Sequence, residues 1–402
     1  MKRFTALISA LALCLCMTAC SNGNGNNTTS AAGGTVALKV WGSQDDQQVL
    51  QMMIDSFKAA NPDVKYDITL GVVGEKDTQA RLLEDAAAAA DVFSFPDDQI
   101  TDLVNAGALY EITRNKDKIE SENISGAVDA ATVNGALYAY PMTADNGYFM
   151  YYDKSVVSDE QAKTLDGVLE ACKKENKKFF MDISNGWYVS SFFLAAGCTV
   201  GVDNNGNQTC DFDNADGIKA GEAVKALCAH PSFVTGDDAV FTGGMGDTIA
   251  AGVSGAWTAE AVMKKLGNNY AAAKLPTATI DGKQVQLKSF AGYKLVGINS
   301  STKQPLEAMK LAEWLTNEEN QLLRFEKREA GPSNTKAAQH SEVQANVALT
   351  ALAAQNEFGV SQRGIKSTFW SPLEAFGTTM ENKDYSKSVS ELLKSMVKDI
   401  TT

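Results

Sequence analysis

The chain has few of the residues on which metal and redox chemistry depend. Among 402 residues there are only two histidines, His230 and His340, and the seven cysteines form no Cys-x-x-Cys pair. Histidine and closely spaced cysteines are the usual ligands of zinc and of redox-active sites. A calcium loop starting at Asp203 is also disfavoured, because its glycine is the fourth residue of the loop and not the sixth. We therefore expect no metal and no cofactor.

Basic residues are scarce relative to acidic ones. Lysine and arginine number 36 against 49 aspartates and glutamates, which gives a formal net charge of -13. So acidic a surface repels nucleic acid and anionic lipid headgroups. The composition therefore excludes nucleic-acid binding and argues against anionic ligands.

Long apolar runs are also missing, and the one at the N-terminus is short. It covers residues 4–17, follows Lys2 and Arg3, and falls short of the roughly 20 residues of a spanning helix. This pattern is typical of an export signal. The following Thr-Ala-Cys20 resembles the lipobox of bacterial lipoproteins, whose cysteine is acylated.

That resemblance implies a signal peptide at 1–19, a lipidated Cys20 with a flexible spacer to 35, and a location on the extracellular face of the cell membrane. The polar composition of residues 21–34 suits such a spacer. The alternative is an ordinary signal peptide cut elsewhere, with Cys20 discarded.

Four cysteines remain besides the two in the signal and the lipidated Cys20, and an exported chain can keep disulfides. Cys198 and Cys210 flank a turn-rich stretch symmetrically about Asn204, so a hairpin would set them opposite each other. A disulfide and two free thiols are both compatible with this spacing. Cys172 and Cys228 lie in helical patterns, where they are buried thiols or a second disulfide.

Strand and helix patterns alternate in the first hundred residues. Alternation of apolar residues predicts strands at 35–42 and 64–72, and helical spacing predicts helices at 45–60 and 78–90, before a strand at 91–95. This order predicts an α/β fold with mostly parallel sheets flanked by helices. Ligands of such sheets bind beyond the carboxyl ends of the strands. The candidate site therefore includes residues 41–46, 95–99 and 141–146.

The rest of the chain continues the mixture of strands and helices. Asn134-Gly135 and Asp281-Gly282 predict tight hairpin turns, and an aromatic strand is expected to end at Pro141. Helices are predicted at 164–176 and 213–229, and a single amphipathic helix at 308–327, where Trp314 belongs to the core. About 370 residues exceed one core, so we expect two lobes. Because no linker separates them, the chain should cross between the lobes more than once.

Several segments resemble extracellular solute-binding proteins of family 1, the maltose- and maltodextrin-binding lipoproteins of ABC sugar importers. These are "LKVWGSQDD" (38–46), "VNGALYAYPMTADNGYFMYYDKSV" (133–156), "IAAGVSGAWTAEAV" (249–262), "MKLAEWLTNEENQ" (309–321) and "STFWSPLEAF" (367–376). Each match is short, but their order and spacing agree from about residue 36 to the C-terminus.

The resemblance implies a two-lobed type II periplasmic-binding-protein fold that closes on its ligand and crosses between lobes three times. The crossings are expected near 141–146, 289–293 and 336–341. The N-terminal lobe would comprise 36–142 plus 291–338, and the C-terminal lobe 143–290 plus 339–402. The family implies a monomer without enzymatic activity, whose partners are an oligosaccharide, the permease subunits of an ABC transporter and the membrane that holds its lipid anchor.

Two residue types suit sugar recognition. Aromatic rings cover the apolar faces of sugar rings, and planar polar groups bind hydroxyls. From their places after strands we predict Trp41, Phe95 and Gln99 as ligand contacts. The resemblance adds Ser43, Asp45 and Asp98 as hydroxyl partners, Asp145 as a carboxylate at the crossing, and the aromatic residues Trp187, Tyr188, Trp257 and Trp370.

The chain departs from maltodextrin binders at two of these positions and at the neighbouring Asp46. Phe95 stands where they often have tryptophan, Gln99 replaces an arginine and Asp46 replaces a lysine. The loss of two cations changes the partners of the sugar hydroxyls. Aromatic residues from both lobes favour an oligosaccharide, with maltotriose or maltodextrins first and a β-linked or galactose-containing oligosaccharide as the alternative.

Two other functions fit parts of the sequence. An extracellular glycosidase would need two carboxylates across one bond, for which Asp98 and Asp145 are candidates. An adhesin or structural lipoprotein fits the anchor but does not explain the aromatic residues near the expected cleft.

Overall fold

The computed structural model describes residues 34–203 and 206–402. The predicted signal peptide, Cys20 and nearly all of the spacer lie outside the described residues, as does Asn204. Thr35–Thr402 form one compact unit. In this part of the chain no helix is both long and apolar enough to cross a membrane.

The first sheet is built from the N-terminal strands and two later ones. Its order is β17-β16-β3-β1-β2, and β6 also pairs with β16. The strands are β1 (Val36–Gly42), β2 (Tyr66–Val72), β3 (Val92–Pro96), β6 (Ala139–Gly147), β16 (Ser289–Ile298) and β17 (Gly359–Ser361). The β1 strand is parallel to β2 and β3, whereas β16 is antiparallel to β3 and β6.

The second sheet has the order β11-β8-β12-β7-β13. Its strands are β7 (Phe149–Asp153), β8 (Lys178–Phe180), β11 (Phe233–Val234), β12 (Ile249–Ser254) and β13 (Tyr270–Ala273). The β8 strand is parallel to β11 and β12, and β7 is antiparallel to β12 and β13. Only Tyr148 separates β6 from β7, so one continuous extended segment leads from the first sheet to the second.

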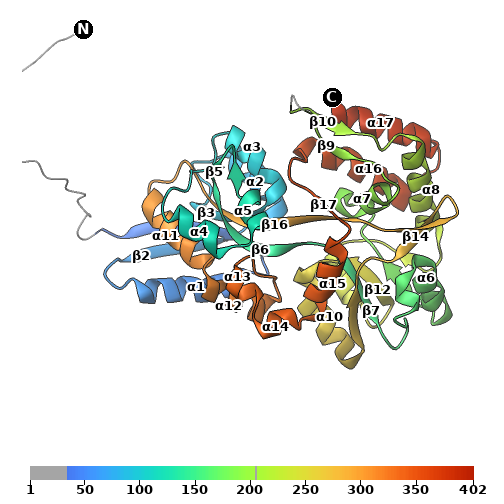
Figure 1. The fold of residues 1–402 in the computed structure, drawn as a ribbon, viewed down its shortest axis with the longest axis horizontal. Coiled ribbons are helices and arrows are strands. Elements are labelled where there is room, and N and C mark those ends of the chain that lie inside the picture. The colour runs from blue at the N-terminus through green and yellow to red at the C-terminus, as the bar shows by residue number, and fades with distance from the viewer. Residues whose placement is uncertain (1–33, 204–205) are drawn as a thin grey trace, which may run out of the picture. The chain divides into compact units, whose positions relative to one another are not determined.

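Helices cover both sheets (Figure 1). The helices α1 (Gln47–Ala60) and α11 (Pro305–Leu315) pack together beside the first sheet, and α12 (Glu318–Arg328) contacts α1. The helices α7 (Gly186–Ala195), α8 (Ala215–Ala229), α16 (Trp370–Glu381) and α17 (Val389–Thr401) form a second packed group. Separate apolar cores lie around Phe93 in the first group and around Phe193 in the second.

Shorter elements complete the fold. The remaining helices are α2 (Thr78–Glu84), α3 (Ile100–Asn105), α4 (Lys116–Glu122), α5 (Ser125–Ala130), α6 (Leu165–Lys174), α9 (Asp238–Gly244), α10 (Ala259–Leu266), α13 (Thr335–Ala338), α14 (Ser341–Gln344) and α15 (Val347–Asn356). Two-stranded ribbons are formed by β4 (Thr132–Val133) with β5 (Ala136–Leu137), β9 (Val200–Val202) with β10 (Gln208–Cys210), and β14 (Thr277–Ile280) with β15 (Lys283–Gln286).

The tight turns lie where the sequence predicts them. Asn134-Gly135 joins β4 to β5 and Asp281-Gly282 joins β14 to β15, each with positive φ at both residues. This is the two-residue turn that matches strand twist and favours Asn-Gly or Asp-Gly. The predicted helices at 45–60, 164–176 and 213–229 are also confirmed, as α1, α6 and α8.

Two predicted helices are wrong in extent, because polar side chains bond the backbone near their ends. The helix predicted at 78–90 stops at Glu84, where Asp85 Oδ1 accepts the backbone N–H groups of Ala87 and Ala88 in a turn. The helix predicted at 308–327 is two helices, because Asn317 caps α12 by accepting the N–H of Asn320. Asn and Asp often replace helical hydrogen bonds in this way.

Pro141 does not end its strand, contrary to the prediction. The β6 strand runs on to Gly147, and Pro141 lies opposite Leu295 of β16. Proline is tolerated where its missing N–H is not needed by a second neighbour. Since β16 is the only strand paired with β6 in the described chain, this condition holds.

The four cysteines of the described chain are free thiols. The hairpin predicted between Cys198 and Cys210 is present, but its register places Val200 opposite Cys210. Cys198 therefore lies outside the paired residues. Cys172 and Cys228 are buried in the second core, and burial raises their thiol pKa values to about 12.

Candidate functional site

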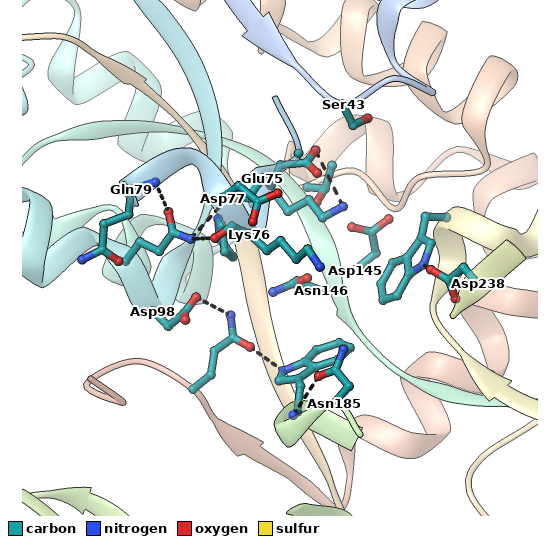
Figure 2. Close-up of a pocket in the computed structure, with 18 of the residues that line it drawn as sticks. Ser43, Glu75, Lys76, Asp77, Gln79, Asp98, Asp145, Asn146, Asn185 and Asp238 are labelled. Carbon is teal, nitrogen blue, oxygen red and sulfur yellow. Dashed lines mark hydrogen bonds and ion pairs between the residues drawn. The ribbon is translucent and has the colours of Figure 1, made fainter. Parts of the chain in front are cut away.

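Strands of both sheets end at one cavity of ≈ 940 Å³. From the first sheet, β1 leads to Ser43 and β3 leads to Asp98. From the second, β8 leads to Asp182 and β12 leads to Trp257. Carboxyl ends of parallel strands are the usual place for ligands in such sheets. Figure 2 shows Ser43, Asp98, Asp145 and Asp238 around this space.

One side of the cavity is an aromatic wall made of Trp187, Tyr188, Trp257 and Trp370. The ring centres of Trp187 and Trp257 lie 5.9 Å apart with planes tilted by 37°, and those of Trp187 and Tyr188 lie 5.3 Å apart at 71°. At such separations a further ring does not fit between two of them. Trp187, Tyr188 and Trp257 therefore form a continuous surface that a ligand can cover from one side.

All four rings of the aromatic wall pack against the second core. Trp187 and Tyr188 both line the cavity although they are neighbours in sequence, because both lie in the first turn of α7. The expectation of aromatic contacts from both lobes is wrong. On the first-sheet side the cavity is lined by polar side chains and a few aliphatic ones.

The position of Trp257 depends on two neighbours. Its indole N–H donates to Asp238 Oδ2 at 2.8 Å, and Ser254 Oγ donates to the other oxygen of the same carboxylate at 2.9 Å. Gly255 lies under the ring, where a Cβ atom would come within 1.9 Å of a ring carbon of Trp257. A glycine is therefore required at this close approach.

Trp41 and Phe95 do not line this cavity. Trp41 packs on the first core with its ring close above Gly71 of β2. Phe95 is fully buried and lies against Gly297 of β16. Both residues lie inside their strands, and their side chains pack into the first core instead of facing the cavity.

The predicted hydroxyl partners Ser43, Asp45, Asp98 and Asp145 all line the cavity. Asp145 is the most buried of them, at 5 % exposure, and its Oδ2 accepts the backbone N–H of Gly331 at 2.7 Å. Its Oδ1 has no hydrogen-bond partner among the described residues. A buried acceptor without a partner is costly, which makes Asp145 well suited to a hydroxyl donor from a ligand.

Gln99 lines the cavity, but the neighbouring loop occupies its amide. Its Nε2 donates to the carbonyls of Glu75 and Lys76, and its Oε1 accepts the N–H of Gln79. These bonds fix the segment between β2 and α2, which carries Glu75 and Lys76 to the cavity. Gln99 therefore acts mainly by positioning this loop.

Positions 46 and 99 carry no cation, but four basic residues from other positions reach the cavity. Lys76, Lys294, Arg324 and Arg328 line it. Lys294 Nζ lies 3.9 Å from Glu75 and 5.3 Å from the centre of the Trp257 ring. The nearby acids Glu75, Asp145 and Asp46 outweigh its burial and raise its pKa.

Asp46 replaces the family's lysine and forms a buried ion pair with Arg324. Arg328 also contacts Asp46, because its Nε lies 3.4 Å from Asp46 Oδ1. Burial disfavours the charged carboxylate, but Arg324, Lys294 and Arg328 together hold the pKa of Asp46 below its usual value. Asp46 is thus occupied inside the protein and offers little to a ligand.

Three other acids at the site have raised pKa values. Burial raises the pKa of Asp97 to about 6, although hydrogen bonds from the Tyr293 backbone and from Gln362 oppose the rise. Burial and the adjacent Asp97 raise the pKa of Asp98, and a hydrogen bond from Trp370 partly offsets this rise. Burial also raises the pKa of Asp182 to about 6.

Several residues of the site were not predicted from the sequence, among them Asp182, Asp238, Lys294, Arg324, Arg328 and Gln362. Asp182 and Asp238 follow the short strands β8 and β11, so the strand-end rule could have found them. Arg324 and Arg328 are four residues apart, the spacing of a shared helix face, but Arg328 lies one residue beyond the helix predicted at 308–327. No local signal distinguishes Gln362.

The arrangement provides apolar ring faces on one side and oxygen acceptors with a few donors on the other. This combination suits a ligand that has flat C–H surfaces edged by hydroxyl groups. Among the lining carboxylates, Asp46 is paired with Arg324, Asp98 and Asp238 accept hydrogen bonds from the protein, and Asp145 has one oxygen without a partner among the described residues.

Comparisons with known proteins agree with this geometry. The chain is 24% identical over 357 residues to the galactooligosaccharide-binding protein of Bacillus subtilis, covering 84% of this chain and 83% of that protein. It is 26% identical over 336 residues to the maltooligosaccharide ABC transporter solute-binding lipoprotein of Streptococcus pneumoniae R6, covering 77% and 76%.

A solved structure determined with acarbose is 30% identical, has a TM-score of 0.84, and covers 92% of this chain and 99% of that one. The predicted two-lobed type II periplasmic-binding-protein fold is therefore confirmed. The model of the family described as bacterial extracellular solute-binding protein matches residues 52–351. The chain belongs to the family of bacterial extracellular solute-binding proteins.

Proposed function

We propose that this protein captures maltotriose or longer maltodextrins outside the cell and delivers them, unchanged, to an ABC importer. The observation that carries the proposal is the aromatic wall facing polar side chains across one large cavity. Stacking on Trp187, Trp257 and Trp370 would hold successive sugar rings, and Asp98 and Asp145 would accept their hydroxyl groups. Relatives that bind maltooligosaccharides support the choice of ligand.

The test is calorimetric titration with maltose, maltotriose, longer maltodextrins and β-linked controls. We expect maltotriose to bind, and Trp257→Ala and Trp370→Ala to cost about 2 kcal/mol each, or roughly thirtyfold in affinity. Trp314→Phe is the matched control. Trp314 packs on Phe57 away from the cavity, so its replacement should leave the affinity unchanged. Absence of maltodextrin binding would refute the α-glucan assignment.

A galactose-containing oligosaccharide is the second candidate. The galactooligosaccharide-binding relative of B. subtilis favours it, and the aromatic wall would serve either ligand. The same titration separates the two, because only one of the sugar series should release heat. Incubation with each sugar should leave it uncut, since the proposal assigns no catalytic step; turnover abolished by Asp98→Asn would point to a glycosidase instead.

The lipid anchor is part of the same proposal and rests on Cys20. A capture protein that works on the outer face of a membrane needs a tether, and a related S. pneumoniae protein is a lipoprotein. Cells that express wild-type protein should retain it in the membrane fraction, and Cys20→Ala should release it into the medium. We further propose a monomer that contacts the permease, with the lobes divided at 36–142 plus 291–338 and 143–290 plus 339–402.

A further inference from the structure

One buried side-chain amide connects the two groups of elements that form the cavity. Gln362, which follows β17 and is 2 % exposed, donates from Nε2 to Asp97 Oδ1 at 2.7 Å and to Asp98 Oδ1 at 3.3 Å. Its Oε1 accepts the indole N–H of Trp187 at 2.9 Å. The amide thus joins the carboxylates after β3 to the first turn of α7.

The chemistry of the partners allows only one orientation of this amide. An indole N–H can only donate, so it requires Oε1, and carboxylate oxygens accept, so they face Nε2. With both ends bonded, neither the amide nor the indole edge can turn without leaving a buried group unsatisfied. The side chain of Gln362 is therefore fixed from both sides.

The backbone next to Gln362 is built to make room for it. A Cβ atom on Gly292 of β16 would lie 2.4 Å from Asp97 Oδ1 and 2.8 Å from both Cδ and Nε2 of Gln362. The register of β16 against β6 also shifts just after Gly292. Only a glycine at this position permits the contact between Gln362 and Asp97.

The side chain of Trp187 needs such a constraint, because its other contacts with the described residues are between rings. Tyr148 lies at its edge at 4.6 Å and 67°, and Trp257 lies beside it at 5.9 Å. Ring contacts of this kind allow the indole to change its orientation. A hydrogen bond from Nε1 is directional, so it fixes where the N–H edge of the indole points. We infer that Gln362 is a positioning residue, which fixes the indole plane of Trp187 within the aromatic wall and thereby sets the affinity for the ring stacked there. This inference rests on the proposed function.

The test is a double-mutant cycle with Gln362→Met and Trp187→Phe. Methionine has similar length but offers no hydrogen bond to the indole, and phenylalanine keeps a ring without the N–H. Gln362→Met removes the hydrogen bonds to Asp97 and Asp98 as well as the one from Trp187, and loss of the bond from the Trp187 indole should weaken maltotriose binding about fivefold. In the Trp187→Phe background, the same replacement should have almost no further effect on affinity.

An equal loss in both backgrounds would show that Gln362 acts independently of Trp187 and would overturn the inference, as would an unchanged affinity in Gln362→Met. Thermal unfolding of the ligand-free variants separates loss of fold from loss of binding. If Gln362→Met is unfolded at the assay temperature, Gln362→Asn, which keeps an amide too short for both partners, goes through the same cycle.

The inference also has a readout that needs no ligand. The near-ultraviolet circular dichroism of ligand-free protein reports the packing of the indoles, so Gln362→Met should change it in the wild type and leave it unchanged in Trp187→Phe. If no oligosaccharide binds the wild type but this spectral dependence holds, the proposed ligand is wrong and the positioning role stands. If sugars bind but the spectral dependence is absent, the positioning role is wrong.

Discussion

Asp238 accepts the indole N–H of Trp257 at 2.8 Å and the hydroxyl of Ser254 at 2.9 Å, so a single carboxylate joins the helix after β11 to the end of β12. Asp237, its neighbour in sequence, instead caps α9 by accepting the N–H of Val240. Adjacent acids at one strand end thus have separate tasks, which makes them a matched pair for mutation.

Asp238→Ala should weaken ligand binding about tenfold, because it frees the indole of Trp257 and removes a charge-assisted hydrogen bond. Asp237 also lines the cavity but does not hold Trp257, so Asp237→Ala should lower the free energy of unfolding by about 1 kcal/mol through loss of the helix cap, with a smaller loss of affinity than Asp238→Ala. Titration of maltotriose and thermal unfolding of both variants check this. Equal losses of affinity would contradict it.

Gly255→Ala should displace Trp257, since the added methyl group would occupy the position of the indole ring. We expect at least tenfold weaker binding together with a loss of stability. Gly243→Ala is the control. It meets no atom within 4 Å and lies in α9, so it should keep full affinity and gain slightly in stability.

Arg328 joins elements from the two sides of the cavity, since its guanidinium lies 3.4 Å from Asp45 and 3.6 Å from Glu260 of α10. Glu260→Gln should reduce ligand affinity about twofold at low salt. The ion pair between Glu260 and Arg328 is partly exposed, so it stabilises the observed arrangement of the two sides of the cavity only weakly. This difference in ligand affinity between the wild type and Glu260→Gln should disappear at about 0.5 M salt, where such ion pairs are screened.

The control for Arg328 is Glu222→Gln, which breaks a pair within one helix, where Lys225 lies 3.8 Å away. It should not change the affinity at any salt concentration. A salt-independent loss in Glu260→Gln would mean that Glu260 contributes through packing and not through its charge.

Stability should depend on pH through Asp182. Its pKa is raised from 3.8 to about 6, mainly by burial, so the folded protein holds the proton more tightly than the unfolded chain. The contribution of this group to the free energy of unfolding therefore decreases as the pH rises from about 4 to about 6, and then stays constant. Relative to wild type, Asp182→Asn should gain on the order of 1 kcal/mol at pH 7 and almost nothing at pH 4.

Denaturant unfolding at several pH values measures this difference. Asp384→Asn provides a control of opposite sign, because hydrogen bonds from Ser386 lower the pKa of Asp384. Its contribution is lost only as the pH falls below about 4. A pH-independent difference for Asp182→Asn would contradict the prediction.

The fold was predictable where the signal is local. Asn134-Gly135 and Asp281-Gly282 form the expected turns because few other sequences accept their backbone conformation. The errors arose where a single side chain overrides a periodic pattern. Asp85 and Asn317 bond to the backbone, and these hydrogen bonds end or divide helices that spacing alone would continue.

The site was predictable as far as the strand ends locate it. Ser43, Asp98 and Trp257 follow strands and reach the cavity, whereas Phe95 lies within its strand and belongs to the core. Gln362 could not be found in this way. Its role depends on Trp187, 175 residues away, and on Asp97, 265 residues away, and no pattern in one sequence records such contacts.

The buried ion pair makes the residue at position 46 and the residue at position 324 depend on each other. A lysine at position 46, as the resemblance to maltodextrin binders implies for that position, would bring two cations together, and removing Asp46 alone would leave the buried Arg324 without its partner at a cost of about 3–5 kcal/mol. These two positions should therefore covary among homologues, and any attempt to graft a maltodextrin-binder loop onto this protein must exchange helix α12 along with it.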